Sequence, residues 1–138
     1  MNLDDLGRNL PALLAAVMMS ILFIQSGLDK VFDWGGNLEW LNGHFSKTFL
    51  APLVPALLAA ITIMEIAAGV LAAVGIVYFL FASSTVLIFW AAVVAALALL
   101  ALFFGQRIAK DYPGAAVIVP YFILALMLIY LTNPFRVA

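Results

Sequence analysis

The residue of this sequence best suited to chemistry is an acid, Glu65, deep inside a long apolar stretch. Between residues 49 and 105 it is the only ionisable side chain apart from one tyrosine phenol. In a helix that begins near residue 52 it lies about 19 Å from the start, close to the middle of a bilayer core about 30 Å thick. A carboxyl there costs about 2.5 kcal/mol or more, so we expect it to face protein and to have a polar partner. Such acids often mark ligand sites or proton pathways, and a packing role is the alternative.

The candidate partners for Glu65 come from the ends of other apolar runs. Depth favours Gln25, about 13 Å inside the membrane boundary, and Tyr121, about 12 Å into the last apolar run. Lys30 starts only about 5 Å inside and reaches Glu65 only by extending inward, against the usual tendency of lysine to snorkel outward. We therefore predict an intramembrane polar cluster of Gln25, Glu65 and Tyr121. The mouth of its cavity is predicted to comprise Ser26, Asp29, Lys30 and Asp111.

Small residues indicate which helix faces are packed. Ala68, Gly69 and Ala72 follow Glu65 at positions +3, +4 and +7, so they share its helix face and permit close approach of a neighbouring helix. Gly27 does the same within the polar end of the first run. These four residues are predicted to pack helices together.

The sequence contains few other residues of the types that catalyse reactions or bind cofactors. It has no cysteine and a single histidine, so thiol chemistry, iron–sulfur ligation and bis-histidine haem binding are excluded. No metal-ligating spacing and no nucleophile–base set is present, and whether the chain is an enzyme is left open. No intrinsic cofactor or metal is expected. His44, beside Phe45, is interpreted as an ordinary solvated side chain.

The elements that must position these residues are membrane spans. The sequence is 67% hydrophobic and 9% charged, which is typical of a lipid-embedded protein. We predict an all-α, integral membrane four-helix bundle forming one domain over residues 1–138, with both termini on the same side. The predicted spans are 11–32, 52–74, 79–104 and 114–132. An interfacial loop is predicted at 33–50, with a short helix ending near His44. Net charge is −1, which gives no case for nucleic acid.

Several short motifs resemble those of DoxX-like membrane proteins. The stretch F-I-Q-S-G-L-D-K is similar to their F-x-x-x-G-x-x-K signature, and I-M-E-I-A-A-G-V is similar to their central acid followed by glycine. R-I-A-K-D-Y-P-G-A-A resembles the loop before their last span. The matching positions are Phe23, Gly27, Lys30, Glu65, Gly69, Asp111 and Gly114.

This resemblance implies a four-helix protein of a prokaryotic inner membrane. Some relatives are the small membrane subunit of a thiosulfate:quinone oxidoreductase, so an accessory subunit of a quinone-linked oxidoreductase or respiratory assembly is the first hypothesis. Quinone is then the expected ligand, and other membrane subunits or further copies of the chain are the expected partners. A non-redox assembly, chaperone or scaffold protein is the alternative. A small oligomeric transporter or proton pathway is the third.

Overall fold

The computed structural model describes residues 2–135, which form six α-helices and one short 3-10 helix and contain no strand. In chain order the elements are α1 (Leu3–Arg8), α2 (Leu10–Phe32), α3 (Trp34–His44), η1 (Ala51–Leu53), α4 (Val54–Ala82), α5 (Val86–Ile108) and α6 (Tyr112–Thr132). This confirms the predicted all-α class. A proline in the first turn starts α2, α4 and α6, a position where its missing N–H costs no hydrogen bond.

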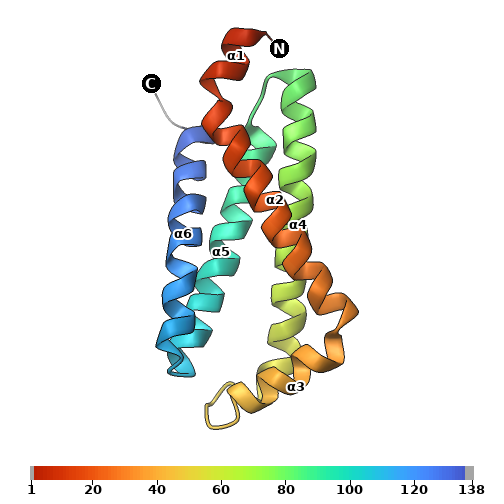
Figure 1. The fold of residues 1–138 in the computed structure, drawn as a ribbon, viewed down its shortest axis with the longest axis vertical. Coiled ribbons are helices and arrows are strands. Elements are labelled where there is room, and N and C mark those ends of the chain that lie inside the picture. Colours follow the sequence, from red (N-terminus) through yellow and green to blue (C-terminus); the bar gives the residue numbers. More distant parts are fainter. Residues whose placement is uncertain (1, 136–138) are drawn as a thin grey trace.

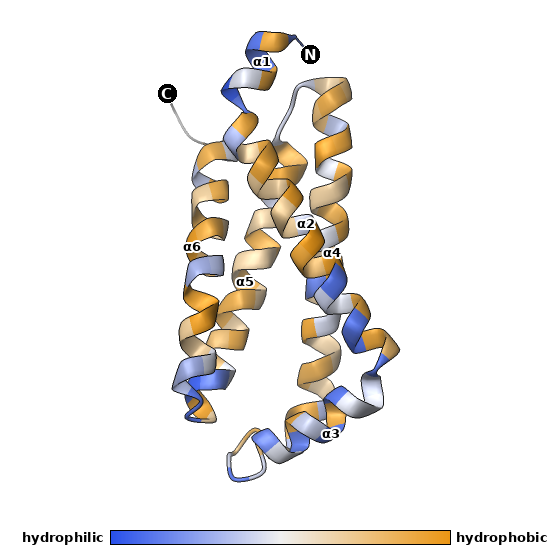
Figure 2. Cartoon of the chain, in the orientation of Figure 1, coloured by the Kyte–Doolittle hydropathy of each residue, from blue (hydrophilic) through white to orange (hydrophobic). Residues whose placement is uncertain are grey.

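Within residues 2–135, four helices are long and apolar enough to cross a membrane by length and composition. They are α2, η1 joined to α4, α5 and α6. Hydrophilic residues gather on α1 at one end of the structure and on α3 and the α5–α6 turn at the other end (Figure 2). This distribution indicates an integral membrane protein.

The four long helices pack as a chain of neighbours, α2 on α4, α4 on α5 and α5 on α6. In Figure 1, α2 runs obliquely across the bundle, and α1 and the end of α6 lie at the same end. Near their connecting turn α4 and α5 approach closely, since a Cβ added to Gly75 would lie 2.9 Å from the Ile88 backbone nitrogen. Toward α3 the ribbons of the two helices separate in Figure 1, and the cavity described below is lined by residues of both.

The turn between α4 and α5 lies later than the sequence predicted. The sequence predicts a second span that ends at residue 74 and a third that begins at residue 79, but α4 continues to residue 82. Gly75 is buried inside α4, where close packing on α5 offsets the low helix propensity of glycine. The helix ends instead at Ser83, which has a left-handed φ of 55°. Ser84 Oγ then accepts a hydrogen bond of 3.3 Å from the Val86 backbone nitrogen and starts α5.

Helix α5 lies between α4 and α6, and its buried residues are mostly alanine. Its fully buried residues include Ala91, Ala92, Ala95 and Ala98, which let α4 and α6 approach it closely. Larger side chains from α2, α4 and α6 complete the core: Met19, Phe79 and Leu128.

Helix α3 confirms the predicted short helix between the first and second spans. It begins after Asp33, which ends α2. It runs beneath the end of α2 and the start of α4 (Figure 1). A turn over residues 45–50 leads from α3 into η1. The helix and this turn form the floor of the space between α4 and α5.

Candidate functional site

Glu65 lies near the middle of α4 and is the only ionisable side chain among residues 2–135 that is buried. Its exposed fraction is 1%. Ala68, Gly69 and Ala72 are buried on the same face of the helix, as their spacing predicted. The carboxyl is therefore enclosed by protein, on the face of α4 that packs against α2.

Two glycines make the contact between α2 and α4. A Cβ added to Gly69 would lie 2.7 Å from the backbone nitrogen of Ile24. A Cβ added to Gly27 would lie 2.6 Å from Ile66 Cγ1. Each glycine thus removes a side chain at the point where the other helix passes, and this brings the polar end of α2 against Glu65.

Lys30 is the partner that the structure gives to Glu65. Its Nζ lies 3.0 Å from Glu65 Oε1, and the lysine side chain is 18% exposed. The ammonium also donates to Ser26 Oγ at 2.9 Å, one helical turn back toward the membrane centre. The lysine therefore extends inward along α2 instead of snorkelling outward, because a buried carboxylate and a hydroxyl hold its charge there.

The ion pair leaves hydrogen-bonding capacity unused. Although Nζ and Oε1 are at ion-pair distance, their orientation does not meet hydrogen-bond geometry, and Oε1 accepts no hydrogen bond from any described residue. Buried acceptors are nearly always paired, and an exception can reflect a catalytic role or a site for a bound water or ion. The pair is therefore a candidate for interaction with a ligand or a proton.

The structure does not bring the other expected members of the polar cluster to Glu65. Gln25 is exposed, and it makes no side-chain hydrogen bond within the described part of the chain. Gln25 points away from α4. At about 100° per residue, Gln25 lies roughly 200° around the helix from Gly27, which faces α4, whereas Lys30 lies roughly 60° from Gly27. Tyr121 is half-buried on α6, a helix that packs mainly against α5.

The predicted mouth residues lie on two helices. On α2, Lys30 forms the ion pair and donates to Ser26, while Asp29 is exposed. Asp111 lies at the start of α6, where its Oδ1 accepts a hydrogen bond of 3.0 Å from the Gly114 backbone nitrogen. Whether these residues act in a common function stays a prediction.

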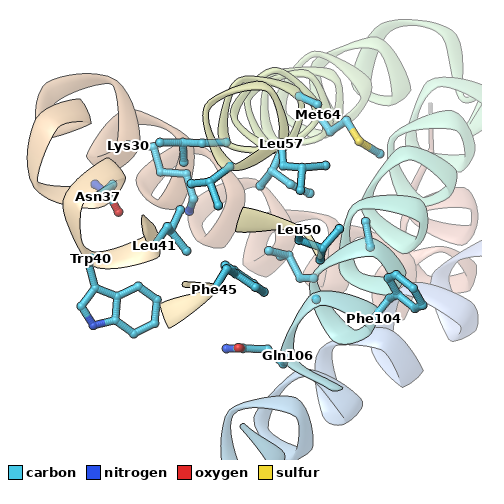
Figure 3. Close-up of a pocket in the computed structure, with 17 residues that line it drawn as sticks. Lys30, Asn37, Trp40, Leu41, Phe45, Leu50, Leu57, Met64, Phe104 and Gln106 are labelled. Carbon is cyan, nitrogen blue, oxygen red and sulfur yellow. The ribbon is translucent and has the colours of Figure 1, made fainter. Parts of the chain in front are cut away.

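A cavity of about 430 Å³ lies beside the ion pair, between α3, the 45–50 turn, the first half of α4 and the end of α5. Figure 3 shows its wall, with α3 residues on one side and α5 residues on the other. Three polar side chains line it: Lys30, Asn37 and Gln106. The rest of the wall is apolar, so the arrangement is suited to an apolar ligand with few polar atoms.

His44 connects α3, at the floor of this cavity, to the end of α5 and the start of α6. Its Nε2 lies 2.7 Å from Gln106 Oε1 and 3.7 Å from Asp111 Oδ2. The ring is stacked on Trp40 with centroids 4.5 Å apart. The sequence interpretation as a solvated side chain differs from this, because contacts across 62 residues of separation leave no local pattern.

These features define a class, an all-α membrane protein with a buried ion pair beside an apolar cavity. Residues 2–135 contain no group of three or more His, Asp or Glu side chains that could hold a metal ion. Comparisons with protein-family models, with curated proteins and with solved structures found no match.

Proposed function

We propose that this protein is a DoxX-like integral membrane protein that serves as an accessory subunit of a quinone-linked oxidoreductase or respiratory assembly. In this function the chain has no catalytic activity alone. It holds a quinone in the cavity between α3, α4 and α5, next to a partner that carries the redox centre. The membrane is a prokaryotic inner membrane, and both termini lie on one side of it.

The observation that carries this proposal is the position of Lys30, which lines the cavity and is held by the buried Glu65. A quinone has a long apolar tail and two carbonyl oxygens that accept hydrogen bonds. The cavity has apolar walls and donors on Lys30, Asn37 and Gln106. A volume of about 430 Å³ is within the range of small-molecule sites.

The ion pair also suits a ligand whose protonation changes during turnover. Reduction of a quinone consumes protons, and an acid–base pair beside the head group can exchange them. Glu65 is shielded from solvent, while Lys30 retains partial exposure, so Lys30 is the member of the pair in contact with the cavity.

The experiment is native purification in mild detergent, followed by mass spectrometry of co-purified subunits and of extracted lipids. The proposal predicts a membrane oxidoreductase subunit and a quinone, both recovered in proportion to the chain. Recovery of non-redox membrane proteins with no quinone would support the scaffold alternative instead. Recovery of the chain alone, without quinone, would contradict the proposal.

A further inference from the structure

The cavity carries a single ionisable side chain among the described residues of its wall, and the charge of that side chain is already matched. We infer that the cavity selects neutral amphiphiles, with a hydrogen-bond acceptor in the head group, and that Glu65 sets this selectivity by neutralising Lys30. This selectivity specifies the class of ligand at the proposed site. It rests on the part of the proposed function in which the cavity between α3, α4 and α5 binds a ligand.

The apolar wall suits the tail of such a ligand. Leu57, Ile61 and Met64 are spaced by four and three residues on α4, so they form a stripe about 10 Å long. Phe104 of α5 also lines the cavity (Figure 3). Leu57 and Phe104 line the cavity and are 40% and 55% exposed, so the cavity is open along two membrane-spanning helices. A tail therefore enters from the bilayer.

The ammonium of Lys30 suits a neutral oxygen in the head group. Of its three N–H groups, one donates to Ser26 Oγ at 2.9 Å, and Glu65 Oε1 lies at 3.0 Å. The remaining contact, with the Ser26 carbonyl oxygen at 3.5 Å, is longer than a good N–H···O hydrogen bond. A hydroxyl, ether or carbonyl oxygen can take its place without breaking the pair.

An anionic head group is disfavoured at the same position. A carboxylate next to Lys30 brings a second negative charge close to Glu65, in surroundings where charges are poorly screened. No other cation among residues 2–135 lines the cavity to offset it. The wild-type site therefore favours an alcohol over a carboxylate that carries the same tail.

The test compares hexadecanol with palmitate, which have the same chain length, on the purified full-length protein in nanodiscs of neutral phospholipid. The pH is alkaline, so that palmitate is ionised. Wild-type protein is expected to bind hexadecanol about tenfold more tightly than palmitate. Glu65→Gln removes the matching charge and keeps the shape, and it is expected to bind palmitate about tenfold more tightly than wild type does.

Two further variants separate charge from fold. Lys30→Met combined with Glu65→Gln removes both charges, and it is expected to lose the gain in palmitate binding. Ala60→Trp fills the cavity and is expected to bind neither probe, whereas Ala67→Trp, an exposed position on the same helix outside the cavity, is expected to bind as wild type. Far-UV circular dichroism monitors folding. If Glu65→Gln does not fold, the ratio of the affinities of wild type for hexadecanol and palmitate still tests the inference.

Equal affinity of wild type for the two probes would overturn the inference, as would a folded Glu65→Gln protein with no gain for palmitate. Unchanged hexadecanol binding by Ala60→Trp would also overturn it, because the probe would then bind elsewhere. A competition arm with a short-tailed ubiquinone separates the inference from the proposed function. Selectivity for the alcohol without competition by the quinone supports the inference and counts against the quinone-linked function.

Discussion

Removing the ammonium of Lys30 should be among the most destabilising single changes in this protein. Lys30→Met keeps a side chain of similar length but leaves the carboxyl of Glu65 without its cationic partner. Removing one member of a buried ion pair costs about 3–5 kcal/mol in unfolding free energy. We expect about 3 kcal/mol, the lower end of that range, because the Lys30 side chain is 18% exposed and the pair is not fully dehydrated.

The reverse change should cost less. Glu65→Gln leaves a lysine that still donates to Ser26 Oγ and still reaches solvent, so we expect a loss of about 1–2 kcal/mol. The double variant contains no unpaired charge and should lose only roughly 1 kcal/mol. The double variant should therefore be more stable than Lys30→Met alone by about 2 kcal/mol. Additive single losses would sum to about 4–5 kcal/mol, so the expected coupling is about 3–4 kcal/mol, at or above the upper end of the range for residues in contact.

The assay is reversible unfolding in mixed detergent micelles, followed by far-UV circular dichroism. Lys47→Met is the matched control, since Lys47 is exposed and forms no ion pair within residues 2–135. It should change the unfolding free energy by less than about 0.5 kcal/mol. Equal effects of Lys30→Met and Lys47→Met, or additive effects of the two changes at the pair, would refute the reasoning.

The remaining predictions concern helix packing, the cavity floor and one turn. Gly69→Ala should lower the unfolding free energy by about 1–3 kcal/mol, and by more than Gly27→Ala, because its added methyl would lie 2.7 Å from a backbone atom of the facing helix, against 3.3 Å for Gly27. His44→Ala should speed amide hydrogen exchange in α3, which forms the floor of the cavity. Unchanged exchange would show that the contact between His44 and Gln106 does not stabilise α3. Ser83→Gly should raise the unfolding free energy by roughly 0.5–1 kcal/mol, because φ is 55° there, and a decrease would contradict the assigned conformation.

The helical fold could be predicted from the sequence because the thickness of the bilayer core sets the length of an apolar helix that crosses it. Apolar runs of about 20 residues predict membrane spans, and residues 2–135 form four helices of that kind. The position of the second turn is predicted wrongly, because α4 continues through Gly75 instead of ending at residue 74. A glycine stops a helix only when no partner compensates for it, and here the close approach of Ile88 does so.

The site was readable only in part. The small residues after Glu65 predicted the buried face of α4, because helical spacing is a local property. Depth alone then favoured Gln25 over Lys30 as the partner. The direction of Gly27 around the helix is also local information, and it would have favoured Lys30. The cavity and the His44–Gln106 contact depend on how α3 folds back, for which the sequence has no local pattern.

The proposed function and the ligand selectivity both depend on the cavity beside Lys30 and Glu65 being a ligand site. The most direct measurement is native mass spectrometry of the protein extracted from its own membrane, as wild type and as the tryptophan variants of Ala60 and Ala67. We predict a bound neutral lipid on wild type and on Ala67→Trp, and none on Ala60→Trp. The same adduct on all three proteins, or no adduct on any of them, would contradict the account.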